Sequence, residues 1–534
     1  MARRALLMMG MLAAAGCTPP LRFADRAILW RDPDDKPIPK PAPRDPPYHW
    51  VAIRDAVFNP ADQVLSIDYT RESVNVNAVD ETPDSTWWTD RMRVPGQPRP
   101  RRLSPDEVSR GAFGEEPRPL LPLTVTKGKA KGGTLGFVVK DAIGRQFAIK
   151  IDPAGYVSLN TSTEVVVTRL AWAAGWNVPA ESILDLRVGD LVLSPKATTT
   201  DAEGHKKPLD AERFREILAR APMSPDGTIR ALASLWIAGD IVGPYSYQGR
   251  RADDANDRVR HEERRDLRGY GVFSAWVNNV DTTEANTLDS YVGSDGRGHL
   301  VHWQQDVGGS FGSRAAEPMF YWMGADTYFS MSRMVASLFS FGIVHRPWEG
   351  EEVRARRARL LALYPELGWY DDAGFDPRGW HPIFDNPAFE RATARDRYWG
   401  AKRILSLGQP ELRAAIAEGR YRPAAAQRLF DVLWSRREKI LRAYFSELPP
   451  LDYFRVENGA LCWDDLWIAA GLGGEHSADY QADGVVVPRD QPRCVAVGGG
   501  YRVVALRVRR NGERRFSGAV RVHLIDRRIV GVER

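Results

Sequence analysis

The apolar positions of the chain predict a strand-rich segment followed by a helical one. Early in the chain, short apolar runs alternate with glycine-containing turns, and residues 137–140 and 146–151 predict the two strands of a hairpin. Thr161 and Glu164 then stand at the spacing of a capping box before a longer apolar run that stops at Gly175. This run predicts a helix.

Helical periodicity dominates residues 211–448. One helix is expected over residues 428–444, where the apolar side chains fall on a single face, and another from about Asp396 to Gly408. Residues 278–312 lack this periodicity. The pattern therefore predicts a helical region with one non-helical interruption.

After Pro450 the pattern returns to alternation. Residues 501–508 and 520–524 alternate apolar and polar side chains, and Asn511-Gly512 between them is a strong signal for a tight hairpin turn. A small β domain is expected at this end of the chain.

The first residues have the layout of a bacterial export signal. Arg3 and Arg4 precede an apolar run at residues 5–15, which is too short for a bilayer-spanning helix of ~20 residues. The run ends in Ala14-Ala15-Gly16-Cys17, which resembles a bacterial lipobox. The alternative is an ordinary signal peptide with a chance cysteine.

The lipobox resemblance implies a diacylglycerol on Cys17, whose two acyl chains would anchor the protein stably to a membrane. Thr18, rather than Asp, follows the cysteine. By the sorting rule of proteobacterial lipoproteins, this implies the outer membrane, with the folded part in the periplasm or on the surface. Seven prolines in residues 31–47 favour polyproline II. We expect this segment to be a spacer that holds the folded part away from the bilayer.

Composition narrows the classes of function. Apolar residues make up 43% of the chain, which has 17 tryptophans, so sizeable cores are expected. The net charge of +5 arises from 74 basic and 69 acidic side chains and gives no indication of nucleic-acid binding. Three cysteines exclude a disulfide-based scaffold, but Cys462 and Cys494 could pair in an oxidising compartment.

Five side chains occur in an order that suits phosphoryl transfer. Lys150 lies on the second hairpin strand, and Glu164 lies near the start of the next helix. Asp281 and Asn286 are five positions apart, and Asp306 follows an apolar strand and precedes Val-Gly-Gly. Phosphoryl transfer uses a lysine on the phosphates, a carboxylate that orients it, a base for the acceptor, and an Asn and an Asp that hold the metal.

A glycine-rich loop at residues 132–136, the strand lysine, the helix glutamate, D-x-x-x-x-N and D-x-G follow the order of protein kinases. The chain departs from eukaryotic kinases, because Asn279-Val280 stands in place of His-Arg, Val307 replaces the Phe of Asp-Phe-Gly, and the loop lacks G-x-G-x-x-G spacing. It resembles more closely the atypical HipA- and CotH-like kinases, over roughly residues 121–448.

Two stretches carry this resemblance further. Residues 164–179 are similar to the HipA-type helix that leads through a glycine to a Val-Pro strand. Residues 245–289 resemble a group of bacterial lipoproteins, and that likeness extends over about residues 55–454. It brings no known substrate.

The resemblance implies a role for each residue. Lys150, oriented by Glu164, would hold the phosphates of ATP, and Asp281 would position or deprotonate the acceptor hydroxyl. Asn286 and Asp306 would coordinate Mg²⁺ or Mn²⁺. The backbone would approach the phosphates at three glycines: Gly132, Gly133 and Gly136.

An α+β fold is therefore expected, with a two-lobed, protein-kinase-like domain. In chain order, the expected segments are a lipoprotein signal peptide (1–17), a Pro-rich linker (18–48), an N-terminal extension (49–118), a β-rich N-lobe (119–195), a helical C-lobe (196–448) and a small β domain (449–534).

The expected function is that of a lipid-anchored, atypical kinase-like phosphotransferase that acts on an envelope or surface protein or on a small molecule. The expected partners are the membrane, through the lipid on Cys17, and this acceptor, with no nucleic acid. The alternative is a non-catalytic, kinase-shaped lipoprotein that binds another envelope protein.

Other interpretations compete for the same residues. Lys150 could be a surface lysine on a strand edge, and Glu164 could serve only as a helix cap. Residues 308–312, Gly-Gly-Ser-Phe-Gly, match the nucleophile elbow of α/β-hydrolases, which would need parallel strands downstream, an Asp and a His. Three histidines are available there: His345, His381 and His476. The downstream pattern of helices and antiparallel strands argues against that fold.

Residues 249–268 are dense in charges of both signs. A solvated helix and loop is the simpler interpretation. The alternative is that one of four arginines meets phosphate or an acidic substrate: Arg250, Arg251, Arg264 or Arg265.

Overall fold

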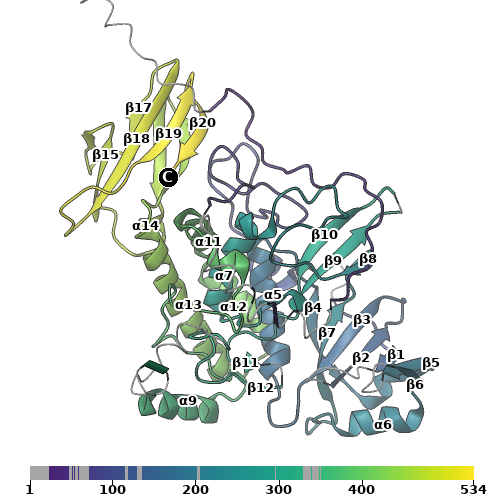
Figure 1. Ribbon diagram of the computed structural model, residues 1–534. Coiled ribbons are helices and arrows are strands. Elements are labelled where there is room, and N and C mark those ends of the chain that lie inside the picture. Colours follow the sequence, from purple (N-terminus) through teal and green to yellow (C-terminus); the bar gives the residue numbers. More distant parts are fainter. Residues whose placement is uncertain are drawn as a thin grey trace, which may run out of the picture.

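The computed structural model describes most of the chain. The described ranges are 23–46, 71–114, 118–128, 135–200, 205–294, 296–314, 316–328 and 350–534, with a few isolated positions between them. The protein is mixed α/β, with a sheet-rich region first and most helices later (Figure 1). Within the described ranges, no helix combines the length and the apolar character needed to cross a membrane.

A seven-stranded sheet forms the first region, in the order β4-β7-β3-β2-β1-β5-β6. The predicted hairpin is confirmed, because β2 and β3 pair antiparallel around a turn in which Gly144 has φ +86°. The strands are β1 (Leu123–Gly128), β2 (Leu135–Lys140), β3 (Gln146–Ile151), β4 (Glu181–Leu186), β5 (Leu191–Thr200), β6 (Lys206–Pro208) and β7 (Ile229–Leu235).

The sheet extends beyond the expected boundary at residue 195. β7 lies between β3 and β4 and pairs antiparallel with both, although helical periodicity was expected from residue 211. Between residue 211 and β7, only α6 (Ala211–Ala219) is helical, and it packs against the sheet through Phe214. Periodicity cannot distinguish a short buried strand from a helical segment, which explains the error.

α5 (Leu159–Ala174) follows β3 and is buried along its whole length except at Trp172. Its predicted end is confirmed, because Gly175 adopts φ +119° as the C-cap residue. A side chain at Gly175 would overlap the indole of Trp88, which also explains the glycine.

The later helices surround the main core. α13 (Pro423–Phe445) confirms the expected helix and buries its apolar face, and α11 (Ala394–Leu405) starts next to the predicted Asp396. The other α-helices in the described part of the chain are α4 (Pro105–Arg110), α7 (Arg265–Val277), α9 (Glu351–Leu363), α10 (Pro387–Glu390), α12 (Gln409–Glu418) and α14 (Leu466–Ala469).

The predicted non-helical interruption is confirmed between α7 and the later helices. It contains β9 (Thr287–Val292) and β10 (His299–Gln304), which form a three-stranded antiparallel sheet with β8 (Asp240–Gly243). The loops at the ends of β9 and β10 carry Asp281, Asn286 and Asp306.

Two further sheets form the C-terminal β region. Cys462 and Cys494 are disulfide-bonded across neighbouring strands. β18 and β19 pair antiparallel as expected, and a turn forms at Asn511-Gly512, where Gly512 has φ +87° and the N–H of Glu513 donates to the carbonyl of Arg510 at 3.0 Å. The connection is longer than a two-residue hairpin loop, because nine residues, 511–519, join the two strands, and the N–H of Ser517 donates to the carbonyl of Val508 on β18. The strands are β13 (Leu451–Glu457), β14 (Ala460–Asp465), β15 (Ala478–Ala482), β16 (Val485–Val487), β17 (Cys494–Ala496), β18 (Tyr501–Arg510), β19 (Val520–Ile525) and β20 (Arg528–Glu533).

The Pro-rich segment is not a free spacer within its described part, residues 31–46. Ile38 is buried, and its N–H donates to the carbonyl of Gly298. The N–H of Arg44 donates to Val242. An extended segment has no internal hydrogen bonds, so its backbone groups can pair with the folded body instead. Figure 1 shows this purple segment running along the body toward β8.

The charged residues 249–268 are only partly solvated, and burial argues against the phosphate interpretation for three of the four arginines, whereas for exposed Arg250 it stays a prediction. None of the four arginines lines the cavity described below. The Arg251 guanidinium donates to the carbonyl of Ala42, and this hydrogen bond ties the Pro-rich segment to the folded body. Three of the four are buried in ion pairs: Arg251 with Asp289, Arg264 with Asp266, and Arg265 with Asp80 and Asp396.

Candidate active site

Lys150 is the centre of the candidate site. It lies on β3, between Gly136 on β2 and Leu232 on β7. Its Nζ is 2.6 Å from Oε1 of Glu164 and 2.8 Å from Oδ1 of Asp306. The structure thus brings together three of the five predicted residues, and Lys150 is not a surface lysine on a strand edge.

The capping interpretation of Glu164 is wrong. α5 begins at Leu159, two residues before the expected Thr161, so Glu164 lies in its second turn. Asp152 caps the helix instead, because its Oδ1 accepts from the N–H of Thr161 at 3.1 Å and its Oδ2 from that of Ser158 at 2.8 Å. This cap fixes the start of α5 to the end of β3, and so sets Glu164 opposite Lys150.

Asp281 and Asn286 are held beside Asp306 by backbone bonds. Val280 N–H donates to the carbonyl of Gly309, and Gln305 N–H donates to that of Asn286, each at 3.0 Å. The Asn286 side-chain amide also donates to the carbonyl of Asp281 at 2.7 Å. The D-x-x-x-x-N loop and the D-x-G loop therefore lie side by side.

These loops open on a cavity of about 430 Å³. Asp281, Asn286 and Asp306 all line it, and Asp306 is 58% exposed at its side chain, whereas Glu164 is 1% exposed. The other lining residues are Val51, Asn160, Val280, Thr283, Ala285, Gly309, Arg314, Met323, Tyr328, Ile383 and Phe384. Lys150 does not line the cavity, but its ammonium contacts Asp306, which does.

The glycines after Asp306 are required by close packing. A Cβ at Gly308 would lie 2.2 Å from the side-chain amide of Asn160, and one at Gly309 would lie 3.0 Å from Cβ of Asp281. Asp306 itself has φ +50°, an unusual conformation for a residue with a side chain, and such residues cluster at functional sites. Gly132 and Gly133 lie outside the described residues, whereas Gly136 pairs in register with Lys150.

The electrostatics of the site favour charged Lys150. Burial lowers the pKa of this amine, but the carboxylates of Asp306, Glu164 and Glu181 outweigh burial and raise its pKa above the ordinary value. For Asp281, burial raises the pKa of the carboxyl, and nearby Asp306 adds to this effect. Asp281 therefore accepts a proton more readily than an exposed aspartate does.

Glu181 was missed by the sequence analysis. It is 1% exposed at the start of β4, and burial, together with the charge of Glu164, raises its pKa well above the ordinary value. The available signal was a glutamate at the start of a short apolar strand. Asn160, also missed, is 3% exposed and lines the cavity.

The hydrolase interpretation is wrong. β10, which precedes the Gly-x-Ser-x-Gly motif, belongs to an antiparallel sheet, whereas the nucleophile elbow follows a strand of a parallel one. Ser310 is fully buried and cannot present its hydroxyl to a substrate.

No protein-family model matches the sequence, and no curated protein matches it. Among solved structures, the Golgi casein kinase is similar to this chain at 10% sequence identity and a TM-score of 0.21, over 73% of this chain and 97% of that chain. This is a weak similarity to a kinase-like protein.

Proposed function

We propose that this protein is a lipid-anchored, two-lobed, kinase-like phosphotransferase of the HipA- and CotH-like kind. One observation carries the proposal: Lys150 contacts both Glu164 and Asp306, and Asp306 shares a cavity with Asp281 and Asn286. The seven-stranded sheet would be the N-lobe, and the helices around α7 and α13 the C-lobe.

The side chains fit ATP with Mg²⁺ or Mn²⁺. Hard divalent cations prefer carboxylate and amide oxygens, which Asp306 and Asn286 offer at the same cavity. Lys150 would hold the phosphates, with its ammonium oriented by buried Glu164. The bound metal would neutralise charge on the transferring phosphoryl group.

Asp281 would position the acceptor hydroxyl and accept its proton. Its side chain faces the same cavity, beside the backbone of Gly309. The acceptor would be an envelope or surface protein, or a small molecule with a hydroxyl group.

Nucleotide binding provides the direct test. Mg-ATP or Mn-ATP is expected to raise the unfolding temperature, because a ligand at a hundred times its Kd stabilises by about 2.7 kcal/mol. Asp306→Asn is expected to lose this shift, since it removes a metal-binding charge, whereas Asp431→Asn on the exposed surface of α13 should keep it. The measurement is differential scanning fluorimetry, with ADP and metal alone as references. Absence of any shift with wild-type protein would reject the phosphotransferase and favour the non-catalytic binder.

Anchoring through Cys17 is the second part of the proposal. The Cys462–Cys494 disulfide supports an oxidising compartment. The Phe23 ring contacts His523 of β19, and six residues of chain span at most about 20 Å. A lipid on Cys17 would therefore place the C-terminal β region close to the membrane.

Cys17→Ser is expected to move the protein from the membrane fraction to the soluble envelope fraction, because it removes the lipidated atom and with it the two acyl chains. Thr18→Ser, which keeps the cysteine, should stay in the membrane fraction. Fractionation and the intact mass of the purified protein measure this. Wild-type protein without added lipid mass would refute the anchor.

A further inference from the structure

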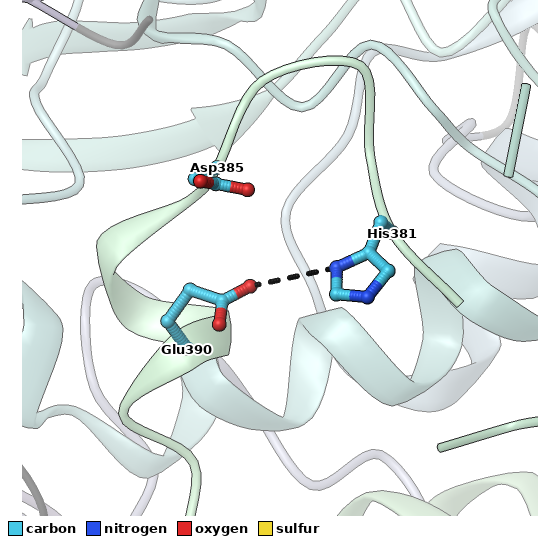
Figure 2. Close-up of side chains that lie close together, drawn as sticks. All are labelled: His381, Asp385 and Glu390. Carbon is cyan, nitrogen blue, oxygen red and sulfur yellow. Dashed lines mark ion pairs between the residues drawn. The ribbon is translucent and has the colours of Figure 1, made fainter. Parts of the chain in front are cut away.

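His381, Asp385 and Glu390 converge beside the candidate active site. Figure 2 shows His381 on a loop, Asp385 where this loop meets α10, and Glu390 on α10 itself. One ligand atom from each lies within 4.8 Å of the others, and Nδ1 of His381 is 3.9 Å from Oε1 of Glu390.

We propose that these three side chains bind a divalent transition-metal ion, Zn²⁺ or Mn²⁺. Three atoms within 4.8 Å of one another leave a point at most about 2.8 Å from each, so small side-chain rotations reach the ~2.0–2.2 Å bonds of zinc. One imidazole nitrogen with two carboxylates is a donor set for such ions, whereas Ca²⁺ and Mg²⁺ prefer oxygen alone.

The surroundings suit an ion that exchanges with solvent. The side chains of His381 and Glu390 are 34% and 24% exposed, so both are partly desolvated yet reachable. Both also line a cavity of about 350 Å³. Three protein ligands would leave the remaining coordination positions to water or to a ligand in this cavity.

The backbone that carries the ligands is already fixed. His381 N–H donates to the carbonyl of Gly324 at 3.2 Å, which anchors the start of the loop. Asn386 closes its end, because its side-chain oxygen caps α10 and its amide donates to Thr282 at 3.0 Å. Such anchoring limits the conformational entropy that metal binding would cost.

The same loop supports the candidate catalytic loop. Ile383 N–H donates to the carbonyl of Val280 at 2.9 Å, next to Asp281, and Ile383 lines the cavity that contains Asp281. An ion held by His381, Asp385 and Glu390 would cross-link this loop to α10. The metal would thus restrict motion of the loop that bonds to the backbone next to Asp281. It would occupy a site separate from the one formed by Asn286 and Asp306.

Calorimetric titration of the EDTA-treated, dialysed full chain with ZnCl₂ and with MnCl₂ tests the site. We expect one ion per chain at this site, and His381→Ala and Glu390→Gln should each weaken its binding at least about tenfold. His476→Ala, at an exposed histidine of the C-terminal β region, should leave binding unchanged. Asp306→Asn should also retain this ion, which separates the site from the proposed nucleotide-metal site.

Glu390→Gln keeps the shape of the side chain, so this variant is expected to fold. Circular dichroism would reveal a variant that loses metal binding only because it fails to fold. The proposal is overturned if neither metal binds, or if binding is the same in wild type, His381→Ala and Glu390→Gln. It does not depend on phosphotransfer, since metal binding is measured without nucleotide.

Discussion

Replacing Asp281 with Asn is expected to lower the rate of the proposed phosphoryl transfer by about 10²–10⁴-fold, which is the usual contribution of a positioned general base. An amide keeps the shape of the side chain but cannot accept the proton of the acceptor hydroxyl. Nucleotide binding should persist, because Lys150, Asn286 and Asp306 are unchanged. Transfer of γ-phosphate from radiolabelled ATP, to the protein itself or to envelope extracts, measures the effect.

The pH profile gives an independent readout of the same group. Burial raises the pKa of Asp281, and the base works only when deprotonated, so wild-type activity should fall as pH drops through this raised pKa. Asp431→Asn should behave as wild type at every pH. A D281N variant that retains more than a tenth of the activity would exclude Asp281 as the base.

Replacing Lys150 with Met is expected to destabilise the fold by about 3–5 kcal/mol near neutral pH, the usual cost of leaving a buried charge unpaired. Glu164 and Glu181 are each 1% exposed, and both would lose the ammonium that compensates them. The methionine keeps most of the side-chain volume, so little of the effect would come from packing. Urea unfolding followed by tryptophan fluorescence measures it.

The pH dependence of this loss has a defined sign. Burial and the charge of Glu164 raise the pKa of Glu181, so lowering the pH protonates this carboxylate, and the K150M variant should recover much of its stability in acid. Raising the pH should increase the deficit. Lys140→Met, at the exposed end of β2, should lose little stability at any pH. A uniform deficit across pH would mean that packing, rather than charge, dominates.

Much of the local architecture follows from neighbouring residues along the chain. The β2–β3 hairpin, the end of α5 at Gly175 and the buried face of α13 were all predicted, because turn conformations and the two periodicities depend on residues a few positions apart. The order of the five polar residues was also visible. That these five residues form one site was inferred only from the resemblance to HipA- and CotH-like kinases.

Contacts between distant segments were out of reach of such patterns. β7 lies between β3 and β4, the charge of Glu181 on β4 acts on Lys150 on β3, and the Pro-rich segment packs along β8. The charges of residues 249–268 predicted a solvated segment, because some of their partners cannot be found from local spacing: Arg265 pairs with Asp80 and Asp396, each more than a hundred positions away. The burial of a side chain and the identity of its partners depend on how distant segments pack together. The spacing of residues in the sequence therefore predicted candidate site residues, and only the tertiary structure decided which of them contact one another.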